Sequence, residues 1–516
     1  MSKDKGLSAG SVGLLGAITI GLACVAPPYT LTGALGPTAA AVGHQVPAII
    51  LIGFIPMLLT AFGYRELNNV MPDSGTSFTW GVRAFGPYVG WLSGWGLIVA
   101  TCVVLSNIAG IAVDFFFLLI SQLVSQEWSP WVASLTRDPV INIATCLIFM
   151  FLATFISYRD MQTTQRIQYI LVSLQLLIFI GFGCVMFYEG YVLHVPNFSP
   201  IEASWFNPLE VSSFGTLATG ISISLFIFWG WDVTLTMNEE TKGASSTPGK
   251  AATWTVVIVV FIYLFVSLGA MVYAGTGTTG IGLGNPDIQN NVFFALANPV
   301  FGSFAALISL AVLTSSAASL QSTFVSPART LLAMGHYGAM SKKFARIHPR
   351  FFTPGYATIF SAIATSIFYT VMRILSEKVL WDTVQTLGIM ICFYYGLTAY
   401  SCVWYFRKKW FDSFRNAMFM LFMPLIGAMI LTWLFVQTIV ESMDPEFGSG
   451  SQIFHIGLVF WLAILLIGLG IVIMVYQRLR YPDFFFGKTG LSQGIADDKQ
   501  EQEFAEHTPE SVTVDI

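Results

Sequence analysis

The sequence predicts an all-α integral membrane protein with twelve transmembrane helices, arranged as a five-plus-five inverted repeat followed by two peripheral helices. Three observations support this prediction. The 516 residues are 55% hydrophobic and only 10% charged, whereas soluble domains carry about 25% charged residues. Twelve apolar stretches are long enough to span a bilayer, which takes about twenty helical residues. Two of them, the first and the sixth, are interrupted near their middles.

The apolar stretches follow one another along almost the whole chain, separated by polar connections. A long apolar run without strand-like alternation indicates a buried or membrane-spanning helix. In order, the stretches cover residues 12–36, 47–70, 88–123, 139–157, 167–188, 211–237, 251–274, 301–328, 354–373, 383–405, 417–440 and 454–477.

The distribution of basic residues predicts the orientation in the membrane. If the helices alternate from a cytoplasmic N-terminus, 21 of the 24 Lys and Arg residues fall on the cytoplasmic side, and only Arg137, Arg373 and Lys378 fall outside. Loops rich in Lys and Arg are typically cytoplasmic, and a miscounted helix would have scrambled this pattern. We therefore expect a multi-pass protein of the plasma membrane with both termini in the cytoplasm.

The same pattern divides the chain into five parts. Residues 1–10 form a cytoplasmic tail, 11–190 the first repeat, 191–410 the second repeat and 411–478 the last two helices. Residues 479–516 form an acidic tail, whose last 22 residues hold seven acids and one Lys. Because this tail lacks apolar periodicity, we expect it to be disordered.

The first stretch is broken by a pair of prolines in its middle. Pro27 and Pro28 carry no N–H, so the carbonyls of Ala23 and Cys24 lose their helical partners. Unsatisfied backbone at membrane depth is tolerated only where it faces protein or a wet cavity. The freed carbonyls can bind a cation or an ammonium, and the N–H groups of a second half-helix can bind an anion.

We expect this helix to stop near Val25 and to restart near Tyr29, with a binding site at the gap. The alternative interpretation is a proline kink that serves only packing. The candidate substrate-binding residues of this first break are Cys24, Val25, Ala26, Pro27, Tyr29 and Thr30.

The second break lies in the sixth stretch, where Gly230 sits among bulky aromatic residues. Asp232 is an ionisable residue at membrane depth, which indicates a functional site. The alternative interpretation is structural, with Asp232 capping a second half-helix; the two interpretations are compatible. The candidate substrate-binding residues here are Phe226, Phe228, Trp229, Gly230 and Asp232.

The two breaks are more informative together than separately. They occupy the first and sixth of twelve stretches, about 200 residues apart. Interrupted helices at matching positions of two halves indicate an inverted repeat with a binding site between the halves, near the midplane of the bilayer. Five helices per repeat give the halves opposite topology.

Two further groups of residues are candidates for binding. Asp114 lies near the external end of the third stretch, where it either attracts substrate or is solvated or paired. The eighth stretch carries hydroxyls that could ligate sodium together with carbonyls of the first break, or could serve only close helix packing. The candidate cation ligands are Ala23, Cys24, Ser315, Ser316 and Ser319.

Several motifs resemble the amino acid–polyamine–organocation (APC) superfamily. The run from Phe228 to Asp232, followed by Asn238–Thr241, is similar to its G-F-D and E-E-T pattern, and the segments Pro72–Trp80 and Ser326–Gly335 resemble two further signatures. The resemblance implies a leucine-transporter-like fold with substrate bound at the two breaks. It also implies that Phe226, four residues before Gly230, is a gating aromatic.

The sequence departs from this pattern in two places. The first break reads Val25–Pro28 instead of a glycine-rich run, which leaves fewer N–H groups for a carboxylate, so we expect a substrate other than a standard α-amino acid. Some proton-coupled relatives carry a Lys in the fifth span, where this chain has Gln175. We therefore favour sodium as the coupling ion, with proton coupling through Asp232, or exchange without an ion, as alternatives.

The resulting expectation is a secondary transporter of an amino acid or related amine. An exchanger, an exporter or a non-transporting nutrient sensor would look the same. A channel would show a continuous polar stripe, and a membrane enzyme would need clustered His, Asp or Glu. The net charge of −4 argues against nucleic-acid binding. We expect no cofactor or metal apart from Na⁺ or H⁺ as coupling ion, a lipid bilayer as environment, and an oligomeric state that the sequence does not specify.

Overall fold

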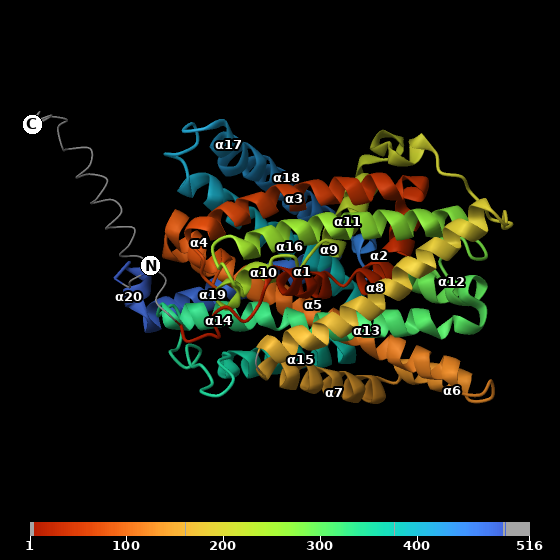
Figure 1. Cartoon of the computed structure of the whole chain (residues 1–516), viewed down its shortest axis with the longest axis horizontal. Coiled ribbons are helices and arrows are strands. Elements are labelled where there is room, and N and C mark those ends of the chain that lie inside the picture. Colours follow the sequence, from red (N-terminus) through yellow and green to blue (C-terminus); the bar gives the residue numbers. More distant parts are fainter. Residues whose placement is uncertain (1–4, 160, 376, 489–490, 492–516) are drawn as a thin grey trace, which may run out of the picture.

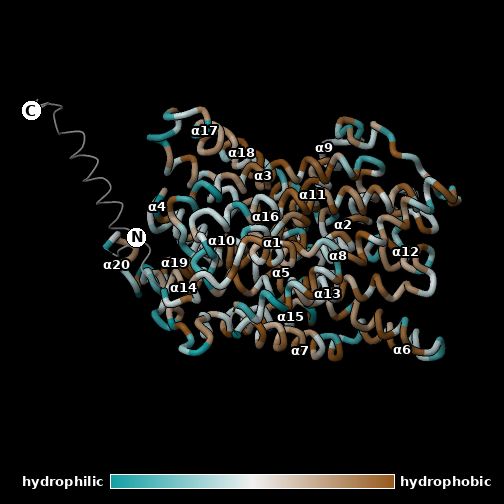
Figure 2. Tube along the Cα trace, viewed as in Figure 1, coloured by the Kyte–Doolittle hydropathy of each residue, from teal (hydrophilic) through white to brown (hydrophobic). Residues whose placement is uncertain are grey.

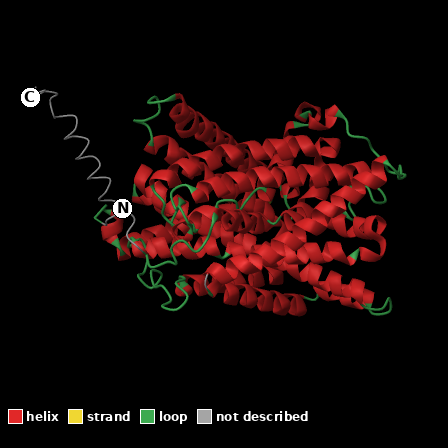
Figure 3. Cartoon of the chain, viewed as in Figure 1, coloured by secondary structure: helices red, strands yellow, loops and turns green. Residues whose placement is uncertain are grey.

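We analysed a computed structural model that describes residues 5–159, 161–375, 377–488 and 491. Most of the described chain is helical, and loops connect the helices at the two ends of an elongated bundle (Figure 3). The strands in these residues form one short hairpin, β1 (Gln452–Ile453) and β2 (Ile456–Gly457).

The first half of the bundle holds five spans, of which the first is split in two. A short helix α4 (Ser77–Phe85) precedes the third span, and α6 (Ser129–Ser134) follows it. The spans are α1 (Leu14–Val25) with α2 (Pro27–Val42), α3 (Val46–Val70), α5 (Pro87–Leu123), α7 (Pro139–Tyr158) and α8 (Met161–Tyr191).

The second half repeats this pattern, with its first span again split. A further helix, α12 (Val292–Phe301), lies in a connection. The spans are α9 (Phe214–Ile227) with α10 (Val233–Thr236), α11 (Thr247–Ala274), α13 (Ala306–Thr323) with α14 (Val325–His336), α15 (Gly355–Leu375) and α16 (Glu377–Tyr405). The last two spans are α18 (Met423–Glu441), preceded by α17 (Phe414–Asn416), and α19 (Leu458–Arg480), followed by α20 (Pro482–Phe485).

Ten described helical stretches are long and apolar enough to cross a membrane. One of them, Leu14–Val70, joins two of the twelve predicted stretches, and the sixth predicted stretch is split into the shorter helices α9 and α10. The hydrophobic colours of Figure 2 run across the middle of the bundle. Outward-facing side chains such as Phe151, Leu177 and Val472 are more than 60% exposed in the isolated chain, as expected for a surface covered by lipid.

The two ends of the bundle differ in charge. We call the left end of Figure 1, which holds the loops with Lys242, Lys342 and Lys408, the basic end. Helices α4, α14 and α20 lie at this end, whereas α6 and α12 lie at the opposite end (Figure 1). The basic end is the one that the sequence predicts to be cytoplasmic.

The prediction of a disordered tail after residue 478 is wrong for its first part. Residues 481–488 are ordered around α20, where Phe484 and Phe485 are almost completely buried. Phe484 stacks on Phe78 of α4 at 5.8 Å between ring centroids. The burial of these two aromatic rings against the bundle stabilises the segment, because it removes apolar surface from water. The sequence did not predict this, because so short a segment shows no periodicity. The seven acidic residues of the tail lie outside the described residues.

The orientation can be tested with cysteines placed in four loops. We expect cysteines at Lys342 and Lys408 to react only with reagent on the cytoplasmic side, and cysteines at Glu202 and Glu446 only with external reagent. The physical reason is the retention of Lys and Arg on the cytoplasmic side. Labelling of intact cells with a membrane-impermeant maleimide measures this, and external labelling at position 342 or 408 would contradict the assignment.

Candidate functional site

The first break is a single left-handed residue between α1 and α2. Ala26 has φ 53° and ψ 65°, and its N–H donates to the carbonyl of Leu22 at 2.8 Å. Helix α2 begins at once with Pro27, two residues earlier than expected, because proline suits the first turn of a helix, where no N–H partner is needed. The carbonyl of Ala23 would pair with the nitrogen of Pro27, which carries no hydrogen.

Hydroxyl groups of α13 form hydrogen bonds with backbone groups of the first break. The Ser319 hydroxyl donates to the carbonyl of Cys24 at 2.8 Å, and the N–H of Tyr29 donates to the Ser315 hydroxyl at 3.3 Å. Two of the three predicted serines therefore contact the break. The third, Ser316, donates instead to a carbonyl of its own helix, that of Val312, at 2.9 Å.

The second break lies directly against the first. Helix α9 ends at Ile227 and α10 begins at Val233, with Gly230 at φ +106° between them. A Cβ on Gly230 would lie 2.9 Å from the Cys24 sulfur and 3.3 Å from its carbonyl carbon. Glycine is therefore required here both by its backbone conformation and by this close approach.

Asp232 is held by two tyrosines of the tenth span. Its carboxylate accepts hydrogen bonds from Tyr395 at 2.9 Å and Tyr394 at 3.3 Å. The indole N–H of Trp229 donates to the same Tyr394 hydroxyl at 2.7 Å. Asp232 is the residue before α10, but its side chain makes no capping bond, so the capping interpretation is wrong.

Tyr263 of α11 joins the two breaks through a single hydroxyl. It donates to the carbonyl of Ile227, the last residue of α9, at 2.5 Å. The same oxygen lies 2.6 Å from the hydroxyl of Thr30 in α2. Sequence analysis missed Tyr263, Tyr394 and Tyr395; the available signal was the presence of phenolic hydroxyls in otherwise apolar spans, which need partners when buried.

A large cavity enters from the end opposite the basic end and reaches the breaks. It has a volume of about 1180 Å³ and is lined by parts of α2, α5, α9, α15 and α16. One face of α5 contributes residues spaced three or four apart, as expected for a helix side. These residues are Asn107, Gly110, Ile111, Asp114, Phe115 and Leu118.

Of the predicted substrate-binding residues, Tyr29 and Phe226 line this cavity. Their rings meet edge to face, with centroids 6.3 Å apart. Asp114 also lines the cavity, together with Arg373 of α15. The remaining predicted residues are buried around the breaks without appearing in the lining: Cys24, Val25, Ala26, Pro27, Thr30, Phe228, Trp229, Gly230 and Asp232.

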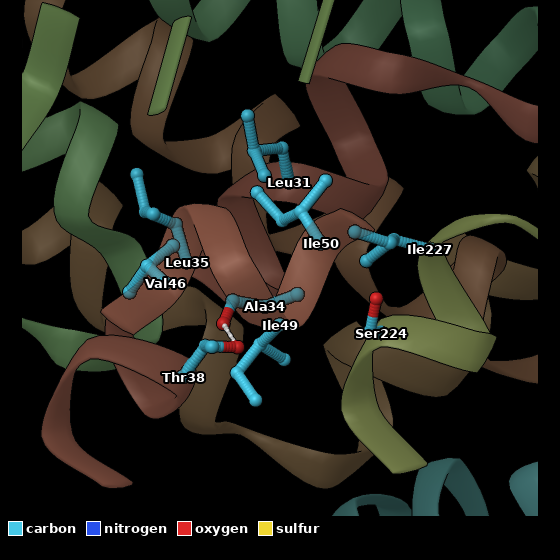
Figure 4. Close-up of a pocket in the computed structure, with 9 residues that line it drawn as sticks. All are labelled: Leu31, Ala34, Leu35, Thr38, Val46, Ile49, Ile50, Ser224 and Ile227. Carbon is cyan, nitrogen blue, oxygen red and sulfur yellow. Dashed lines mark hydrogen bonds between the residues drawn. The ribbon is translucent and has the colours of Figure 1, made fainter. Parts of the chain in front are cut away.

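A second, much smaller void lies between α2, α3 and α9. It has a volume of about 10 Å³, enough for about one water molecule. In Figure 4, Ser224 and Ile227 face Leu31 and Ile50 across it. Its walls are mostly apolar, so it is a packing defect too small for a substrate.

The basic end is closed by buried ion pairs. The ammonium of Lys5 binds Asp73 at 2.7 Å and also binds Glu239, and its side chain is completely buried. Tyr337 donates to the same Asp73 carboxylate at 2.5 Å. A second pair joins Arg329 to Glu240 through two hydrogen bonds of 2.9 and 3.0 Å.

Lys5 and Asp73 both keep their charges near neutral pH. Burial alone would lower the pKa of Lys5, but the Asp73 and Glu239 carboxylates outweigh it and raise that pKa above 10.5. Burial alone would raise the pKa of Asp73, but Lys5 and the Tyr337 and Thr79 hydrogen bonds outweigh it and hold that pKa below 3.8. The Lys5–Asp73 attraction is therefore lost only when pH falls through the lowered pKa or rises through the raised one.

These features define a class of protein before any comparison is made. A bundle with two interrupted spans in matching halves, and a cavity that reaches the interruptions, is typical of membrane transporters. Residues 13–476 match the amino acid permease family. The chain belongs to this family, within the APC superfamily, and is a transporter rather than an enzyme.

Known transporters are similar to this chain over much of its length. The low-affinity putrescine importer PlaP of Escherichia coli (strain K12) is 25% identical over 451 residues, which are 83% of this chain and 89% of the importer. The methylthioribose transporter of Bacillus subtilis (strain 168) is 24% identical over 364 residues, 68% of this chain and 73% of that transporter.

A solved structure confirms the predicted fold class. The crystal structure of MhsT in complex with L-phenylalanine aligns with a TM-score of 0.58 at 15% identity, covering 82% of this chain and 98% of that chain. At this identity the likeness concerns the fold. The chain therefore has the leucine-transporter-like architecture that its motifs implied.

The contact between the breaks makes Gly230 sensitive to substitution. We expect Gly230→Leu, and also the minimal change Gly230→Ala, to abolish transport in a protein that still folds, because even one methyl group strains the backbone and meets Cys24. Substrate counterflow in proteoliposomes measures this. Gly181→Ala is the control, since a Cβ there meets nothing within 4 Å. Wild-type rates in a well-expressed Gly230→Leu variant would contradict the assignment.

Proposed function

We propose that this protein is a secondary active transporter that moves an amino acid or related amine across the cell membrane by alternating access. The observation that carries the proposal is the asymmetry of the pathway. A cavity of about 1180 Å³ reaches Tyr29 and Phe226 from one end, while buried ion pairs of Lys5 and Arg329 close the other end. A transporter of this kind exposes its midplane site to one side at a time.

The substrate class is supported by the family and by its members. The matching family is that of amino acid permeases, and one relative imports putrescine. The breaks combine carbonyl oxygens, aromatic rings and the Asp232 carboxylate, which suit the ammonium group that amino acids and amines share. In this proposal the substrate binds where Tyr29 and Phe226 form the floor of the cavity.

The proposed orientation places the basic end in the cytoplasm of a cell with the protein in its plasma membrane. Both chain termini then lie inside, and the cavity opens outside. This arrangement follows the positive-inside rule, and in this proposal the state with its cavity open to the outside is outward-facing. Exchange and export use the same architecture in the opposite direction, and a nutrient sensor would bind substrate without net flux.

For the coupling ion, the donor set at the first break fits a small hard cation. Such cations prefer oxygen ligands, and the carbonyls of Ala23 and Cys24 and the hydroxyls of Ser315 and Ser319 lie on adjoining segments of α1 and α13. Sodium is therefore our first proposal. Proton coupling through Asp232, or exchange without an ion, is the alternative.

Transport itself is tested by loading proteoliposomes with unlabelled compound and measuring uptake of its labelled form. We expect counterflow with at least one amino acid or amine, dependent on the purified protein. Binding in a thermal-shift assay without counterflow would support the sensor instead. Neither binding nor counterflow with any amino acid or amine would contradict the proposal.

Sodium coupling predicts a specific effect of Ser319→Ala. Removing this hydroxyl takes one oxygen from the proposed ion site, so we expect the sodium concentration for half-maximal uptake to rise about tenfold, corresponding to roughly 1.4 kcal/mol. Thr314→Val is the control, because the Thr314 hydroxyl bonds only its own helix. If replacing sodium by choline at constant pH leaves uptake unchanged, the hydroxyls are structural.

The closed basic end predicts an effect of Lys5→Met. Removing the ammonium leaves Asp73 and Glu239 buried without their cation, which costs about 3–5 kcal/mol in buried pairs and should favour opening at this end. The reporter is a cysteine at Thr236, a buried residue of α10 that contacts α14. We expect this cysteine to react faster with a thiol reagent in Lys5→Met than in the unmodified protein. The exposed Cys184 is removed from both proteins beforehand. Lys343→Met, at an exposed lysine, is the control, and equal rates in both variants would contradict the role of Lys5.

A further inference from the structure

We propose that the transported substrate is a protonated amine without a carboxylate beside its ammonium group. This inference rests on the proposed function, since it narrows the substrate class of the same cavity. An α-amino acid must exchange the hydration of its carboxylate for hydrogen-bond donors or positive charge when it enters the membrane interior. The backbone of the first break, as far as the structure describes it, offers carbonyl acceptors but no free N–H donor.

The backbone donors of the first break are already used or missing. Pro27–Pro28 carries no N–H at the start of α2, where a helix normally presents its free donors. The N–H of Ala26 donates back into α1, and that of Thr30 donates to the Ala26 carbonyl at 3.0 Å. The N–H of Tyr29 is taken by Ser315. Among residues 26–30, no N–H is left for an anion.

The second break adds negative charge rather than positive charge. Asp232 lies within it, and the N–H of Gly230 faces the Tyr395 hydroxyl at 3.5 Å. A substrate carboxylate bound close by would meet an electrostatic cost, which grows where water is excluded. The arginines of the cavity, Arg137 and Arg373, lie toward its mouth on η2 (Leu135–Arg137) and at the last turn of α15.

The floor of the cavity is, in contrast, suited to an ammonium. Tyr29 is only 1% exposed and lines the cavity, and its hydroxyl has no hydrogen-bond partner in the described residues. The ring of Phe226 meets it edge to face, so aromatic surface is available for a cation. The unpartnered Tyr29 hydroxyl can accept a hydrogen bond as well as donate one. An ammonium donates to such acceptors and needs no donor in return.

The test compares amines with the α-amino acids from which they derive by loss of the carboxyl group. The pairs are putrescine and ornithine, agmatine and arginine, isoamylamine and leucine, and phenethylamine and phenylalanine. Dissociation constants are measured by calorimetry on the full chain in nanodiscs, and each compound is also tested for counterflow. We expect the amine of at least one pair to bind at least 100-fold more tightly than its amino acid.

The outcomes separate this inference from the proposed function. If amino acids bind as tightly as, or more tightly than, their amines in every pair that binds, while counterflow occurs, transport stands and the inference is wrong. If none of the compounds binds or shows counterflow, the proposed function fails, and the inference fails with it.

A variant tests the physical cause. Ser315→Ala removes the acceptor of the Tyr29 N–H and so frees one donor at the start of α2. We expect the preference for amine over amino acid to fall about tenfold in this variant, and to stay unchanged in Thr314→Val. An unchanged preference in Ser315→Ala, with a wild-type elution profile, would overturn the account of the first break.

Discussion

Two helices are broken inside the membrane, and the backbone groups that these breaks expose determine how the centre of the protein is built. Lipid offers no hydrogen bonds, so every exposed carbonyl and N–H needs a partner from the protein or a wet cavity. Tyr263 satisfies Ile227 and Thr30 with one hydroxyl, and Ser319 satisfies Cys24. The spans that surround the breaks are therefore fixed by polar contacts as well as by packing.

These contacts also separate the residues of the site into two groups. Asp232 is engaged by Tyr394 and Tyr395, so in this state it anchors the second break against the tenth span instead of facing the cavity. Tyr29 and Phe226, in contrast, line the cavity. The residues that hold the second break and those that line the cavity are therefore neighbours with different roles.

Much of this arrangement could be predicted from the sequence. Pro27 and Gly230 mark the breaks because each disrupts a helix by its covalent structure, and the apolar runs mark the helices that can span a membrane. The orientation that the basic loops indicate stays a prediction. The partners of the breaks could not be predicted, because Tyr263 and Tyr395 are brought to them by packing between distant spans. The burial of Phe484 could not be predicted either. Its partner Phe78 is distant in the sequence, and a four-residue helix shows no periodicity of its own.

The cluster around Lys5 has a consequence for the synthesis of the protein. Lys5 precedes every membrane-spanning helix in the sequence, whereas Phe484, which covers Phe78 beside this cluster, follows all of them. Membrane spans form in order as the chain is made, and domains fold in the same direction. The helices of the bundle are therefore synthesised before the segment that covers its basic end, and that end stays uncovered until α20 has been made.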